Sequence, residues 1–139
     1  MKVLFIAPHL STGGMPAFLL KRIQALQQYN DNVEIFVVEW KMYSPTFVVQ
    51  RNQIQEILGD NFIPLHGNKE FQQNIIKICY DNNIDVIHIE EIPEGFDGHN
   101  PFPFEIQEQL YDSSHPWVVV ETCHNIYFNP NEQKKLEPN

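Results

Sequence analysis

Five short apolar segments alternate along the chain with segments whose apolar residues recur at helical spacing. The apolar segments cover residues 3–7, 33–38, 62–65, 86–89 and 117–120. A strand buried on both faces is a short continuous apolar run, whereas a surface helix buries one stripe. Such alternation predicts a parallel sheet with right-handed crossovers. We therefore expect an α/β fold, a Rossmann-like doubly wound parallel sheet of about five strands with helices on both faces, formed by residues 1–139 as a single domain.

The first two helices have recognisable start signals. Gly13-Gly14 precedes the first, and Pro16 lies in its first turn, where its missing N–H costs nothing. Its expected buried stripe consists of Met15, Phe18, Leu19, Ile23 and Leu26. The second helix is expected to open at Ser44-Pro45, as N-cap and first helical residue, with Val48, Ile54, Ile57 and Leu58 inward. Phe47-Val48-Val49 would also suit a strand.

Two later segments also predict helices. Asn68 is expected to cap the first of them, which would end in the left-handed conformation at Asn82-Asn83. Its expected buried face comprises Phe71, Ile75, Ile78 and Cys79. The other follows a loop rich in Pro and Gly and would bury Phe102, Ile106 and Leu110.

The charge of the chain limits its possible partners, and its cysteines indicate a cellular compartment. The net charge of −9 argues against nucleic acid and anionic membranes as main partners. Residues 1–30 carry +3 and residues 31–139 carry −12, so the first segment is the part suited to an anion. We expect no transmembrane segment, because the longest apolar run is far too short to span a bilayer. Cys79 and Cys123 form no C-x-x-C pair and indicate reduced thiols in a cytoplasmic protein.

Ligands of open parallel sheets bind beyond the carboxyl ends of the strands, where the strand order reverses. With the order 3-2-1-4-5, three loops would meet at that point. They carry His9 to Gly14 after the first strand, Glu90 and Glu91 after the fourth, and His124 and Asn125 after the fifth. Glu90 and Glu91 are adjacent and should point in different directions, which disfavours a paired-carboxylate acid/base site.

Individual residues in these loops suit distinct roles. Gly13-Gly14 opens a helix whose free N–H groups and dipole favour a phosphate, and we expect positive φ at Gly14. The dinucleotide fingerprint and the P-loop lysine are absent. His124 directly follows a buried strand and would donate a hydrogen bond to a sugar hydroxyl or oxyanion, or carry a proton. The other reading is a histidine satisfied by a nearby carbonyl, and a structural role is favoured for His88, within the fourth strand.

These residues carry a resemblance to a known family. Residues 1–8, followed by Ser11-Thr12-Gly13-Gly14 and an amphipathic helix, resemble the start of glycosyltransferase family 4 proteins. Residues 85–90 resemble the fourth strand of that family, and residues 118–125 resemble its fifth strand, which ends in His followed by Asp or Asn. Glu90 departs from the pattern, since many members carry another residue type there. The resemblance covers nearly the whole chain.

The resemblance implies the N-terminal, acceptor-side domain of a retaining GT-B glycosyltransferase that needs no metal and no cofactor. Its partners would be a nucleotide-sugar donor and a glycan or lipid-linked acceptor. By the resemblance, Gly13 and Gly14 would contact the donor diphosphate, His124 would be the catalytic residue, and His9, Glu90, Glu91 and Asn125 would bind acceptor or sugar. The donor-binding C-terminal domain would be missing or a separate chain, and this chain alone would be inactive.

Two alternatives stay open. The chain could be a non-catalytic sugar- or partner-binding Rossmann module, left by truncation or splitting. It could also be a zinc-dependent hydrolase, since Ala7-Pro8-His9 resembles part of the metal-binding loop of sugar deacetylases, with His88, Glu90 and His124 completing the site. No carboxylate follows His9, which disfavours the hydrolase.

Overall fold

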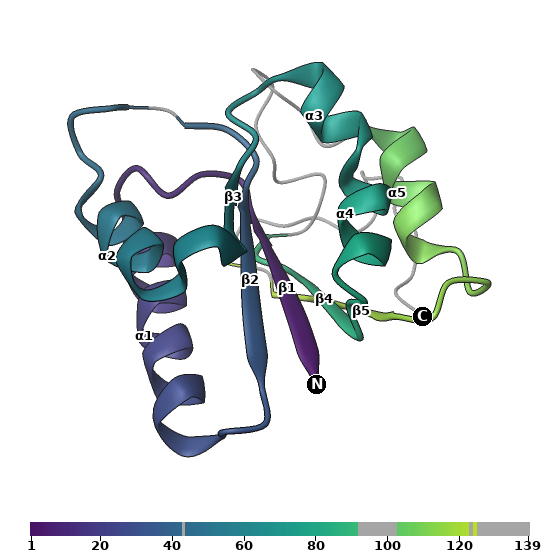
Figure 1. Ribbon diagram of the computed structural model, residues 1–139. Helices are drawn as coiled ribbons and strands as arrows, with labels where there is room; N and C mark the ends of the chain where they lie inside the picture. The colour runs from purple at the N-terminus through teal and green to yellow at the C-terminus, as the bar shows by residue number, and fades with distance from the viewer. Residues whose placement is uncertain (43, 92–102, 123, 125–139) are drawn as a thin grey trace.

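A five-stranded, all-parallel sheet forms the centre of the protein (Figure 1). The computed structural model describes residues 1–42, 44–91, 103–122 and 124. The strands are β1 (Lys2–Ala7), β2 (Glu34–Glu39), β3 (Phe62–Pro64), β4 (Val86–Ile89) and β5 (Val118–Glu121). Their order is β3-β2-β1-β4-β5. The predicted α/β, Rossmann-like fold is therefore confirmed, including the expected strand order.

Helices cover both faces of the sheet (Figure 1). On one side lie α1 (Gly14–Tyr29) and α2 (Val49–Leu58), and on the other lie α3 (Lys69–Gln73), α4 (Ile75–Asp81) and α5 (Phe104–Tyr111). A short 3-10 helix, η1 (Gly59–Asn61), links α2 to β3. A hydrophobic core lies on each face of the sheet, and alternate residues of β1 contribute to one or the other. Leu4 and Ile6 pack on the α4 and α5 side, whereas Val3 and Phe5 pack against α1 and α2.

The start of α2 differs from the prediction. The helix begins at Val49, five residues after Ser44. Ser44 Oγ instead accepts a hydrogen bond from the backbone N–H of Thr46, and it also bonds to Thr46 Oγ1. Such local side-chain bonds compete with helix formation. The competing strand prediction for residues 47–49 is also wrong, because Val49 already belongs to the helix.

The third predicted helix is correctly capped but broken in the middle. Asn68 Oδ1 accepts hydrogen bonds from the backbone N–H groups of Glu70 and Phe71, which confirms the N-cap. The helix stops at Gln73 and restarts at Ile75. In α3, Phe71 is exposed and not buried as expected, whereas Gln72 is buried and its Nε2 donates to the Trp40 carbonyl at 3.4 Å. Phe18 in α1 is likewise exposed and not buried as expected.

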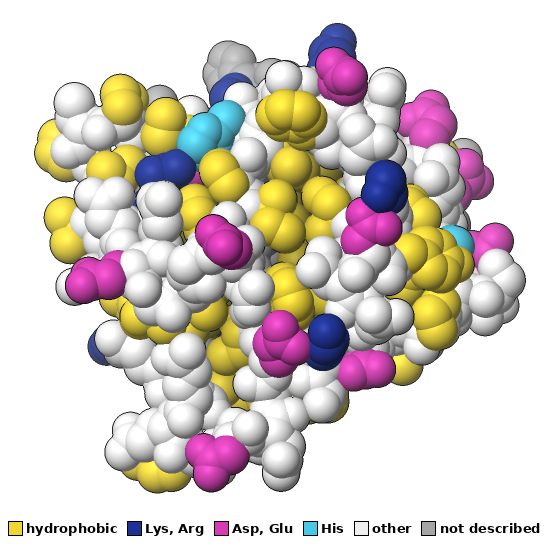
Figure 2. All heavy atoms as spheres, viewed as in Figure 1, with side chains coloured by type: hydrophobic (Ala, Val, Ile, Leu, Met, Phe, Trp, Pro, Cys, Tyr) yellow, Lys and Arg dark blue, Asp and Glu magenta, His cyan; other side chains and the backbone are white. Residues whose placement is uncertain are grey.

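On the face shown in Figure 2, Asp and Glu side chains are spread over several elements and do not gather into one patch. In the part of the chain that the structure describes, no helix is long and apolar enough to cross a membrane.

The predicted left-handed turn after the third predicted helix is present. The last helical residue of α4 is Asp81, and Asn83, two residues later, has φ 53°.

Candidate functional site

The strand order reverses at β1, which lies between β2 and β4. Ala7 pairs with Glu39 and Ile6 pairs with Ile89, so all three strands end at one edge. The Glu90 backbone N–H donates to the Ile6 carbonyl at 2.9 Å. The chain segments after β1, β2 and β4 therefore leave the sheet side by side, as the switch-point rule requires.

One polar cluster at this edge is built around Glu90, immediately after β4. We call it the Glu90 cluster; its members are Arg22, His88, Glu90, Thr122 and His124. The Glu90 side chain is fully buried. Arg22 Nη1 lies 2.5 Å from Glu90 Oε1, and His124 Nε2 lies 3.0 Å from Glu90 Oε2. The carboxylate thus joins α1 to the end of β5.

His88 forms the inner part of the Glu90 cluster. Its Nε2 lies 2.6 Å from Thr122 Oγ1 and 3.1 Å from Arg22 Nη1. Burial, as the largest cause, together with the positive charge of Arg22 and the neighbouring His124, lowers the pKa of His88 to about 4. His88 is therefore neutral at pH 7 and accepts or donates hydrogen bonds without adding charge.

His124 is held in one orientation and remains partly accessible. Its side chain is 23% exposed. The ring meets Phe18 edge-on, with centroids 5.4 Å apart, and the Arg22 guanidinium lies 4.4 Å from the centroid of the same Phe18 ring. Glu90 engages Nε2, while Nδ1 makes no hydrogen bond within the described residues. The ring can therefore present Nδ1 to a ligand while Glu90 fixes its position.

The glycine pair places an open helix start beside this edge. Gly13 is the N-cap of α1, with φ 120°, and Gly14 is its first helical residue. The prediction of a positive φ at Gly14 is thus wrong, because the positive φ is at Gly13, one residue earlier. A Cβ at either position would meet no atom within 4 Å. The first turn carries no acidic residue and no side-chain cap, so its positive dipole end is not compensated locally.

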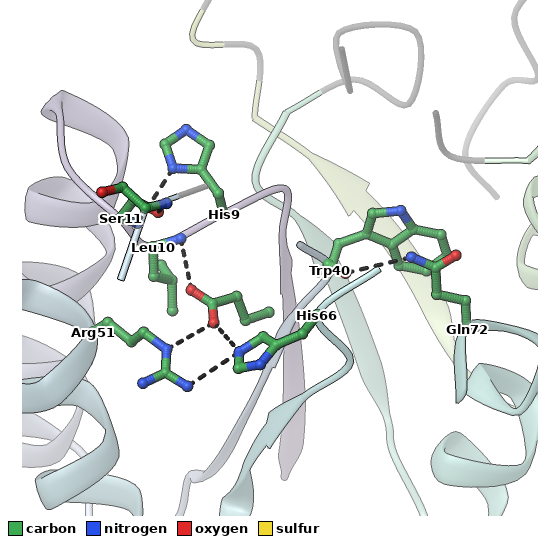
Figure 3. Close-up of polar contacts among 9 residues, drawn as sticks. His9, Leu10, Ser11, Trp40, Arg51, His66 and Gln72 are labelled. Carbon is green, nitrogen blue, oxygen red and sulfur yellow. Dashed lines mark hydrogen bonds and ion pairs between the residues drawn. The ribbon is translucent and has the colours of Figure 1, made fainter. Parts of the chain in front are cut away.

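A second buried carboxylate, Glu39, ends β2, on the opposite side of β1 from β4. Its partners Leu10, Arg51 and His66 are labelled in Figure 3. Its Oε1 accepts from Arg51 Nε at 2.8 Å and lies 2.6 Å from His66 Nε2. Its Oε2 accepts from the backbone N–H of Leu10 at 3.0 Å. We call Leu10, Glu39, Arg51 and His66 the Glu39 cluster. Sequence reasoning missed it, and the available signal was a glutamate ending a buried apolar strand.

The predicted site residues do not all meet. The structure brings Glu90 and His124 together in the Glu90 cluster. His9 lies in the loop after β1, where its Nδ1 accepts from the Ser11 backbone N–H at 3.3 Å. Glu91 is half-buried. Asn125 lies outside the described residues. Of the cluster members, sequence reasoning gave no site role to Thr122 or to Arg22, which was noted only for its charge.

The structure also bears on two other kinds of site, a metal site and a dinucleotide-binding site. Among the described residues, no group of three His, Cys, Asp or Glu side chains is arranged to hold a metal ion. The Arg22 guanidinium contacts both His88 and Glu90, and is thus a cation in the place that a metal bound by these two side chains would need. Glu39 ends β2, where dinucleotide-binding Rossmann domains carry an acid for the ribose, but here protein donors engage both carboxylate oxygens.

No protein-family model, curated protein or solved structure matches this chain. The functional interpretation therefore starts from the fold and from the Glu90 cluster.

Proposed function

We propose that this chain is the acceptor-side Rossmann domain of a GT-B glycosyltransferase, which transfers a sugar from a nucleotide sugar to a glycan or lipid-linked acceptor. The observation that carries the proposal is His124, fixed by the buried Glu90 carboxylate at the switch point of the sheet. The reaction would be retaining and would need no metal. A second domain would hold the base and ribose of the donor. We place the protein in the cytoplasm, since Cys79 is a free, buried thiol.

The chemistry of sugar transfer suits the two parts of this edge. When the sugar is transferred, the nucleoside diphosphate of the donor is the leaving group. Its growing negative charge must be stabilised as the bond between the anomeric carbon and the diphosphate oxygen breaks. The uncapped start of α1 offers backbone N–H groups, and the glycines let a phosphate approach them closely. Because Nε2–H of His124 faces the Glu90 carboxylate, the neutral ring would accept a hydrogen bond at Nδ1 from a hydroxyl of the transferred sugar. Arg22 is already paired with Glu90, so anion binding rests on the helix start.

Titration of the isotope-labelled chain with nucleotide sugars tests the diphosphate role. We expect binding no better than millimolar, because a helix start contributes about 0.3–2 kcal/mol and even millimolar affinity requires about 4 kcal/mol. Amide shifts should be confined to residues 13–15 and to the surroundings of His124. Gly14→Val should abolish them, because its side chain would fill the open space beside the helix start.

The matched control is Ala25→Val, which puts the same side chain on an exposed position further along α1. It should bind as the parent does. Equal shifts in parent and Gly14→Val would rule out the diphosphate role, and so would shifts centred elsewhere. In the enzyme with its donor-binding domain, His124→Ala should lower turnover by about 10²-fold or more. Normal turnover with lost stability would make His124 purely structural.

A further inference from the structure

We propose that Glu39 is a positioning residue that holds the loop between β1 and α1 in its ligand-binding conformation. The inference rests on the proposed function, in which the glycines of that loop receive a diphosphate. Glu39 lies at the end of β2 and is fully buried, so it touches no ligand itself. Its effect on binding would pass through Leu10, four residues before Gly14.

The Glu39 carboxylate connects three separate parts of the fold (Figure 3). Leu10 belongs to the loop after β1, Arg51 to α2, and His66 to the segment after β3. All three donate to or contact the carboxylate within 3.0 Å. Arg51 Nη2 also lies 3.1 Å from His66 Nε2, which closes the cluster. The loop is thereby fixed relative to a helix and to a strand end on the far side of β2.

The backbone of His66 supports this assignment. Its φ is 51°, a left-handed conformation that is unfavourable for a residue other than glycine. Such a conformation persists where the surrounding structure fixes it. The short contact between His66 Nε2 and Glu39 Oε1 is one such restraint. Glu39 therefore stabilises two loops at once, and the left-handed His66 indicates that the geometry is held tightly.

Further bonds carry the restraint from Leu10 toward the glycines. The Lys41 backbone N–H donates to the Pro8 carbonyl at 3.0 Å, and the Ser44 backbone N–H donates to Ser11 Oγ at 3.0 Å. Leu10 and Ser11 are both buried. The loop is therefore anchored up to Ser11, and only Thr12 separates this anchor from Gly13.

The Glu39 carboxylate is needed because both of its oxygens accept hydrogen bonds, Oε1 from Arg51 and Oε2 from the backbone N–H of Leu10. Glutamine of the same shape has one acceptor oxygen and one NH2 donor. In Glu39→Gln, the NH2 group would face either the Leu10 N–H or the Arg51 guanidinium, so one of these bonds would be lost. A buried donor facing another donor is also unfavourable in itself. The substitution should therefore loosen the loop while the rest of β2 stays unchanged.

Hydrogen exchange of the Leu10 amide tests the proposal without any ligand. We expect Glu39→Gln to raise its exchange rate by about tenfold or more, with strand amides of β1 unchanged. Glu34→Gln is the matched control, because Glu34 begins the same strand and pairs with Lys2 at the surface, 3.3 Å away. It should leave Leu10 exchange as in the parent. Equal Leu10 exchange in Glu39→Gln and Glu34→Gln would overturn the positioning role.

A second variant covers the case in which Glu39→Gln does not fold. Arg51→Gln keeps the carboxylate but removes the arginine from its Oε1, which leaves His66 as the contact there, and we expect Leu10 exchange to rise at least threefold. An unchanged rate would overturn the proposal. In titrations with nucleotide sugars, Glu39→Gln should weaken binding about fivefold, whereas Glu34→Gln should bind as the parent does. Faster exchange with no nucleotide-sugar binding in any variant, the parent included, would support the positioning role and refute the proposed function.

Discussion

At the scale of single residues, two buried glutamates organise the carboxyl edge of the sheet. Glu39 and Glu90 lie on opposite sides of β1, and each accepts from one arginine and contacts one or more histidines. Removing a carboxylate from water is costly, and a hydrogen-bonded arginine offsets that cost. Each pair thus lets a charged group sit in the core, where it fixes side chains or backbone at the carboxyl edge of the sheet.

His88 should make the stability of the fold depend on pH. The unfolded chain takes up this proton near pH 6.5, whereas folded His88 takes it up only near its pKa of about 4. The free energy of unfolding should therefore fall as pH falls from about 6.5 to 4, and be unaffected by this group above pH 6.5. Urea unfolding of the parent and of His88→Gln measures the difference. A parallel decline in both proteins over this interval would contradict the prediction.

Substitution by alanine should have different effects on the stability of the fold at Gly13 and at Gly14. Gly13 has φ 120°, a conformation that costs other residues about 1–3 kcal/mol, so Gly13→Ala should destabilise by that amount. Gly14 is helical and its Cβ would meet open space, so Gly14→Ala should be neutral or stabilise by up to about 1 kcal/mol. Chemical denaturation of the two variants checks the order. Equal losses would show that the loop conformation has been misassigned.

At the scale of elements, local signals predicted most of the architecture. Each strand lies within about a residue of its predicted position, because continuous apolar runs are a local property. The late start of α2 coincides with a local bond in which Ser44 Oγ accepts from the Thr46 backbone N–H, and at the helix break after Gln73 the Asn74 side chain donates to the Glu70 carbonyl. The Glu39 cluster could not be predicted, since Leu10, Arg51 and His66 are far apart in sequence and meet only after β1, β2 and β3 pair.

The cap of α3 provides a test at this scale. Asn68 Oδ1 satisfies two backbone N–H groups of a helix only five residues long. Asn68→Ala should therefore lower the free energy of unfolding by about 1 kcal/mol, and Asn68→Asp should largely preserve it. Thermal or urea unfolding of the three proteins measures the effect. A similar loss in both variants would mean that the amide nitrogen, and not the cap, is what matters.

At the scale of the whole molecule, the two outer strands of the described sheet are protected unequally. On one side β3 is three residues long and ends in Pro64, which has no N–H to offer. On the other side β5 carries Val118 and Val120, which are 49% and 40% exposed. No lysine or proline interrupts its four residues. Among the residues that the structure describes, the β5 edge thus has few of the features that normally prevent two sheets from joining.

The colloidal behaviour of the protein should follow from that edge. At pH 7 the net charge of −9 keeps molecules apart by mutual repulsion, so exposed valines on different molecules seldom meet. Near the isoelectric point, about pH 5.0, the repulsion vanishes and attraction between apolar edges dominates. Light scattering should show reversible association near pH 5 that high salt at pH 7 partly reproduces by screening. Val118→Thr with Val120→Lys should reduce the association, whereas Val49→Thr on the exposed start of α2 should not.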